Sequence, residues 1–183
     1  MGTRHFIGVL SDGKYKIANY GQFDGYIEGQ GAQIIEFLAK ADLNKFRNKL
    51  NNCYFINDEE LRQFYVNAGD APENKSGFIK YEVAEKFRKM YPSLTRETGA
   101  QILDIVYHSI DKVPLYNRED FLEDEMWCEF GYVIDLDRET LHCYASGKDL
   151  FAEYILEDLP TVEEMKYDYE QWHKKNCGDT EDE

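Results

Sequence analysis

Alternating hydrophobic and polar positions mark two β-hairpins, one near each end of the chain. Arg4 to Leu10 alternates and is rich in branched residues, and Asp12-Gly13 after it favours a tight turn. Tyr15 to Tyr20 alternates again and completes the first hairpin. Trp127 to Ile134 and Thr140 to Tyr144 flank a polar turn and predict a second hairpin. A further strand is expected after it, at Leu150 to Ile155.

Between the hairpins the apolar residues follow helical spacing. Ile34, Ile35 and Leu38 predict a helix after the first hairpin, and a second stretch places Leu43 and Phe46 on one side. These two helices begin a middle region that we expect to be helical, with a loop from Gly69 to Gly77.

Capping signals place four further helices. Asn57, followed by three acidic residues, can cap one helix, and Tyr81 to Met90 forms another that Pro92 ends. Ser93 is expected to start the next. Thr161 to Glu164 is a capping box that opens a final helix through Trp172. The buried stripe of the helix that starts at Ser93 is expected to be Ile102, Leu103, Ile105, Val106 and Ile110.

These elements predict an α+β fold in which two antiparallel hairpins form the sheet. The helical middle and the C-terminal helix pack against that sheet. We expect one domain over residues 1–176 and an acidic tail over residues 177–183. The chain has 183 residues, 43% of them hydrophobic, which is enough to bury a substantial core.

The environment predicted for the chain is the cytoplasm. No apolar run approaches the length that crosses a bilayer, and no signal-peptide pattern opens the sequence, so we expect no membrane partner. The four cysteines are widely scattered, lack zinc-ligand spacing and are expected to be reduced thiols.

Charge excludes one class of partner. The net charge is −15, and the excess of acidic residues lies in residues 111–183. An acidic surface repels phosphates, so we expect no direct binding of nucleic acid. One alternative function follows from the same charge: an acidic inhibitor or nucleic-acid mimic that covers a basic groove on a host protein.

Four glycines within eleven residues form the strongest candidate site. They stand between a predicted strand and a predicted helix, where backbone N–H groups can approach a phosphate or carboxylate. The spacing matches no known nucleotide motif, the loop has no lysine, and Asp24 and Glu28 would oppose an anion. The other interpretation is a tight crossing in which the glycines serve packing alone. The candidate ligand-binding residues are Arg4, Tyr20, Gln22, Asp24, Gly25, Tyr26, Gly29, Gln30 and Gly31, within or beside the segment Gly21–Gly31.

Catalytic signals are weak, and we predict no catalytic residue, no metal and no cofactor. Thr3 near the start of a hairpin suggests an N-terminal-nucleophile amidohydrolase as a second alternative. Removal of Met1 would expose Gly2 rather than Thr3, so that function needs a further cleavage. Cys128 is expected to be a buried structural thiol, and the Asp135/Asp137 pair is more typical of a turn than of a cation site.

Three stretches together resemble a family of uncharacterised proteins of bacteriophages, prophages and filamentous fungi. They are Met1 to His5, Tyr20 to Gly31, and Trp127 to Asp137. Where related sequences often carry Trp and Pro, this chain has Phe23 and Ile27. The resemblance implies a setting rather than a reaction. If that setting is a phage, the role implied is interference with host defence, in the host cytoplasm.

The function predicted from the sequence is therefore a non-enzymatic binding protein. It would hold a small anionic or nucleotide-like ligand at the Gly21–Gly31 loop. Its partner is either that ligand or a host protein, and no oligomeric state is predicted.

Overall fold

The computed structural model describes residues 2–74 and 77–178, and its centre is a five-stranded mixed sheet. The strand order is β2-β1-β5-β6-β7, with β1 and β5 parallel and all other neighbours antiparallel. Both predicted hairpins are present, and the fold class is α+β as expected. The strands are β1 (His5–Ser11), β2 (Lys14–Gly21), β5 (Phe130–Asp135), β6 (Thr140–Ala145) and β7 (Asp149–Ile155).

The middle of the chain also contains two short strands, which the sequence did not predict. β3 (Cys53–Ile56) and β4 (Val113–Tyr116) pair in parallel as a separate two-stranded sheet. This sheet lies near β2, and the backbone N–H of Arg118, just after β4, donates to the carbonyl of Ala18 at 3.0 Å. That hydrogen bond joins the small sheet to the edge of the large one.

Six α-helices and four shorter helical turns complete the described chain. The α-helices are α1 (Ala32–Lys40), α2 (Leu43–Lys49), α3 (Asp58–Asn67), α4 (Tyr81–Met90), α5 (Gln101–Tyr107) and α6 (Val162–Cys177). The turns are η1 (Ile27–Gly31), η2 (Leu50–Asn52), η3 (Pro92–Leu94) and η4 (Glu119–Glu123).

Most helix ends follow the predicted signals. Asn57 and Thr161 both form complete capping boxes, and α4 ends just before Pro92. The helix expected from Ser93 begins later, at Gln101, because Ser93 lies in the turn η3. Ile110 was expected to be buried but is 91% exposed, since α5 has already ended at Tyr107.

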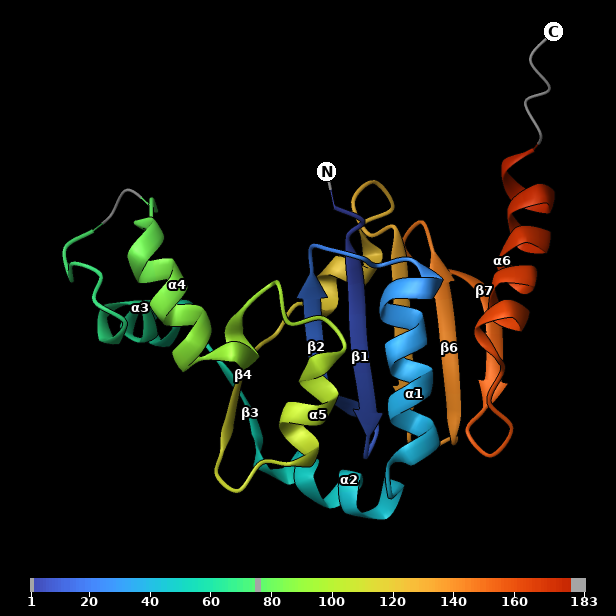
Figure 1. The fold of residues 1–183 in the computed structure, drawn as a ribbon, viewed down its shortest axis with the longest axis horizontal. Helices are drawn as coiled ribbons and strands as arrows, with labels where there is room; N and C mark the ends of the chain where they lie inside the picture. The colour runs from blue at the N-terminus through green and yellow to red at the C-terminus, as the bar shows by residue number, and fades with distance from the viewer. Residues whose placement is uncertain (1, 75–76, 179–183) are drawn as a thin grey trace, which may run out of the picture.

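The two faces of the sheet are covered differently. In Figure 1, α1 and α5 lie across one face, and the segment containing η4 passes behind the other. The helical face holds the main core, in which Ile7, Ile34 and Val106 are fully buried. The opposite face holds a smaller cluster around Phe6 and Leu122.

The C-terminal end of the predicted domain lies within α6. Cys177 belongs to this helix, which therefore runs one residue past the expected boundary at residue 176. Residues 179–183 of the predicted tail lie outside the described residues. Among the described helices, none has the length and apolar character of a membrane span.

Candidate functional site

The three stretches that stood out in the sequence meet at one end of the sheet. On β1, His5 pairs with Gly21 of β2 and with Phe130 of β5. The backbone N–H of Arg4 donates to Glu129 at 2.9 Å, and the Arg4 guanidinium lies 4.4 Å from the ring centroid of Trp127. This end of the sheet therefore contains most of the predicted site residues.

The glycines of the loop are packed against the chain's own atoms. A Cβ on Gly21 would overlap the His5 ring, and one on Gly29 would overlap the carbonyl oxygen of Asp24. A Cβ on Gly25 would come within 2.8 Å of the His5 Cβ, and one on Gly31 within 3.2 Å of the Tyr132 hydroxyl. Close packing accounts for these glycines without a ligand.

Gln30 holds the loop in place. Its buried amide donates to the carbonyl of Phe23 at 3.2 Å and accepts from the backbone N–H of Ala100 at 2.6 Å. The backbone N–H of Gln22 donates to the carbonyl of Arg96 at 2.9 Å. These bonds tie the loop to the segment before α5, through the side chain of Gln30 and through the backbone of Gln22.

The remaining predicted residues divide between solvent and a cavity. Asp24 and Tyr26 are exposed and hydrogen-bond to each other at 3.3 Å, with Asp24 at a positive φ of 57°. The Asp24 carboxylate raises the pKa of Tyr26. Tyr20 instead lines a cavity beside β2, described below. The prediction that the loop itself binds a ligand stays a prediction.

Three residues in or near the loop and its two strands have buried polar atoms without hydrogen bonds. His5 is 1% exposed, and neither ring nitrogen has a partner in the described structure. Burial is the main cause that lowers the pKa of His5 to about 4, against smaller opposing effects of the Thr3 carbonyl and the Asp24 charge. The side chains of Asn19 and Gln22 each have one buried unpartnered atom as well. Such groups are uncommon in folded proteins and often mark a functional region.

A cavity of about 790 Å³ lies between the edge of β2 and the helices α3 and α4. Three of its lining residues are arginines, Arg88, Arg96 and Arg118, and one is an acid, Glu97. Arg88 pairs with both carboxylate oxygens of Glu97 at 2.8 Å, which raises the pKa of the arginine. Among the described residues, Arg96 and Arg118 form no ion pair. The cavity therefore carries uncompensated positive charge.

Aromatic rings form much of the remaining wall. Tyr65 and Phe87 are stacked, with centroids 4.0 Å apart and planes 11° apart. The Arg118 guanidinium lies 5.9 Å from the centroid of Tyr20 and 5.6 Å from that of Tyr116. Burial raises the pKa of Tyr65, while the charge of Arg96 opposes that shift. Arginines and rings thus line the same space.

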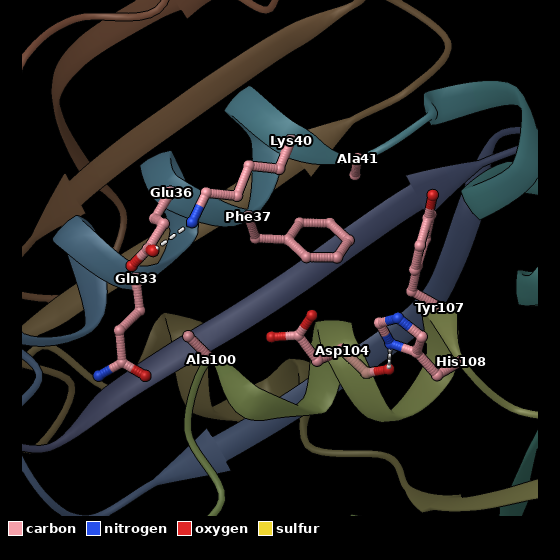
Figure 2. A pocket seen from close by; sticks show the side chains of 9 residues that line it. All are labelled: Gln33, Glu36, Phe37, Lys40, Ala41, Ala100, Asp104, Tyr107 and His108. Atoms are coloured by element: carbon pink, nitrogen blue, oxygen red, sulfur yellow. Dashed lines mark hydrogen bonds and ion pairs between the residues drawn. The ribbon is translucent and has the colours of Figure 1, made fainter.

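A second cavity, of about 420 Å³, lies between α1 and α5 (Figure 2). Glu36 and Lys40 of α1 line one side, Asp104 and His108 the other, and Phe37 lies between them. The Lys40 ammonium is 2.5 Å from the Glu36 carboxylate and lowers its pKa. This cavity has a different lining from the first and no uncompensated arginine.

The described residues offer little for metal or thiol chemistry. No group of three or more histidine, cysteine or acidic side chains among them is arranged to hold a metal ion. Burial raises the pKa of the Cys128 thiol to about 12, so it is protonated at neutral pH and a weak nucleophile. The Thr3 carbonyl accepts from the backbone N–H of Gly25 at 3.0 Å, and the role of Thr3 as a nucleophile stays a prediction.

Comparisons with family models, with curated proteins and with solved structures find no match to this chain. The resemblance to the family of phage and fungal proteins therefore stays a prediction. The sequence did not predict the cavity lined by Arg88, Arg96 and Arg118. These residues are spread over thirty-one positions in three separate elements or loops. Of the predicted residues, Tyr20 is the one that lines this cavity.

Proposed function

We propose that the protein is a non-enzymatic binding protein for a small anionic ligand with a planar ring, such as a nucleotide. This keeps the ligand class predicted from the sequence but places it in the cavity beside Tyr20 rather than in the Gly21–Gly31 loop. The observation that carries the proposal is the pair Arg96 and Arg118, which line the cavity without an acidic partner among the described residues.

The cavity is positively charged, whereas the whole molecule is negatively charged. With a net charge of −15, most of the surface repels an anion. Two uncompensated guanidinium groups provide a local site where a phosphate or carboxylate gains charge-assisted, bidentate hydrogen bonds. An anion is therefore the ligand that this lining favours.

The aromatic lining and the size favour a ring. Aromatic faces stack well on planar ligands, and the half-buried rings of Tyr65 and Tyr116 line the cavity, with Tyr65 stacked on the buried ring of Phe87. A volume of about 790 Å³ lies within the usual range for a small-molecule site. Asn19, nine-tenths buried, lines the same cavity and has an unpartnered amide nitrogen.

Calorimetry with three probes tests the proposal: adenosine monophosphate, adenosine and inorganic phosphate. We expect the nucleotide to bind more tightly than either part, because it uses both the arginines and the rings. Arg96→Gln and Arg118→Gln should each weaken nucleotide binding about tenfold, the effect of losing ~1.4 kcal/mol of a charged hydrogen bond.

The matched control is Arg138→Gln, at an exposed arginine in the turn between β5 and β6. It removes the same charge from a distant place and should leave nucleotide affinity unchanged. The proposal is wrong if none of the three probes binds at millimolar concentration, or if Arg138→Gln weakens binding as much as the cavity variants do.

The other roles predicted from the sequence are hypotheses that do not depend on the arginine cavity. Cytoplasmic location, a phage setting and interference with host defence have no further support from the geometry. The amidohydrolase alternative is tested by the intact mass of the purified protein, because a chain that retains Gly2 cannot use Thr3 as an N-terminal nucleophile.

A further inference from the structure

The cleft between α1 and α5 shares no lining residue with the arginine cavity and is a separate site (Figure 2). Its two walls come from helices that lie side by side on the sheet. The question is which charge in the cleft lacks a partner.

The uncompensated charge is the carboxylate of Asp104. Glu36 and Lys40 also line the cleft, but they pair at 2.5 Å and neutralise each other. The Asp104 side chain is exposed and forms no hydrogen bond or ion pair with another described residue. In Figure 2 its carboxylate points toward the space beside the Phe37 ring. Among the residues that line the cleft, the charge balance therefore favours a cation.

A second acceptor lines the same cleft. Nδ1 of His108 lies 3.0 Å from the backbone carbonyl of Asp104, which can accept only from a protonated nitrogen. In the neutral imidazole this leaves Nε2 with a free lone pair. Asp104 and His108 thus each offer a side-chain acceptor to a ligand in the cleft.

Aromatic rings provide the apolar part of the cleft. Phe37 is 7% exposed and packs edge-to-face on Tyr107 at 5.9 Å. The Tyr107 ring already holds the Lys45 ammonium 4.0 Å from its centroid, a cation–π contact. The Tyr107 ring is thus already in contact with Lys45, and Phe37 is the lining ring left for the apolar part of a ligand.

We propose that the α1–α5 cleft is a binding site for a small organic cation, a primary amine that carries an apolar ring. The ammonium group bonds to the Asp104 carboxylate and to Nε2 of His108, and the ring lies against Phe37. This site is independent of the proposed anion site.

The experiment measures the affinity of benzylamine and of its neutral analogue, benzyl alcohol, by ligand-observed NMR. We expect the wild-type protein to bind the amine at least fivefold more tightly than the alcohol. Asp104→Asn should remove this preference, whereas the control Asp111→Asn, at an exposed acid just beyond α5, should retain it. Both sites are exposed, and an unchanged melting temperature confirms that each variant is folded.

A gain of affinity provides the second arm. Lys40→Gln releases the Glu36 carboxylate from its ion pair and should tighten benzylamine binding about threefold, with no effect on benzyl alcohol. Equal binding of amine and alcohol by the wild type overturns the proposal. So does an Asp104→Asn variant that behaves like Asp111→Asn, or weaker amine binding by Lys40→Gln. Arg96→Gln should leave benzylamine affinity unchanged, which separates this result from the fate of the anion site.

Discussion

At the scale of single residues, His5 links the fold to pH. Its pKa is lowered from 6.5 to about 4, mainly by burial, so the folded protein keeps the ring neutral where the unfolded chain protonates it. The contribution of the neutral His5 ring to the free energy of unfolding is therefore complete above pH 6.5 and is lost as the pH falls toward 4. We expect this one residue to remove about 3 kcal/mol of the free energy of unfolding over that interval.

Urea unfolding at several pH values measures this effect in the wild type and in His5→Leu. The leucine cannot titrate, so the fall in stability between pH 6.5 and 4 should be smaller by about 3 kcal/mol. His173→Gln, at an exposed histidine of α6, should keep the wild-type slope. Identical slopes for His5→Leu and the wild type would contradict the assignment.

Gly29 separates the two interpretations of the glycine loop. A Cβ there would overlap the backbone oxygen of Asp24, which cannot move as a flexible side chain can. We expect Gly29→Ala to destabilise the protein by about 2 to 3 kcal/mol, as overpacking does. Gly13→Ala, in an open turn at φ 70°, should cost only about 1 kcal/mol. Thermal melting decides: a stable Gly29→Ala protein would mean that the glycine is not required for packing.

At the scale of elements, the cap of α6 fixes how that helix begins. The Thr161 hydroxyl accepts from the N–H of Glu164 at 3.2 Å, and the Glu164 carboxylate accepts from the N–H of Thr161 at 2.7 Å. Thr161→Ala should cost about 1 kcal/mol of unfolding free energy, whereas Thr161→Ser keeps the hydroxyl and should cost little. Thermal unfolding of both variants checks this, and equal losses would show that the hydroxyl is not the cause.

The elements that the sequence predicts are those with local signals. The hairpins follow from alternation and turn residues, and α3 and α6 from capping boxes that involve neighbours only. The strands β3 and β4 have four residues each and pair across about sixty positions, as Cys53 with Val113. Segments this short show no clear period, and a parallel partner that distant leaves no local trace.

The candidate sites show the same difference between local features, which the sequence predicts, and features that depend on the fold. The glycine cluster is visible in the sequence because it is local, and the structure gives each glycine a packing neighbour. The arginine cavity depends on three residues from α4, from the segment after η3 and from the segment after β4. Only the fold brings Arg88, Arg96 and Arg118 to one space, so no spacing rule could have found them.

At the scale of the whole molecule, the net charge of −15 makes salt act in opposite directions on stability and on binding. Raising NaCl from about 20 mM to about 200 mM shortens the screening length from roughly 20 Å to roughly 7 Å. Repulsion among the excess acids then weakens, and the melting temperature should rise. The same screening weakens the attraction between a nucleotide and Arg96 or Arg118, so its affinity should fall.

Measuring both quantities on one protein preparation distinguishes a local cationic site from a general property of the surface. If the nucleotide is held by the two arginines, Arg118→Gln should lower the affinity and also flatten its dependence on salt, while the melting temperature still rises with salt. A nucleotide affinity that increases with NaCl would instead mean that repulsion by the acidic surface dominates the interaction. In that case the two arginines do not provide the main electrostatic contribution to nucleotide binding.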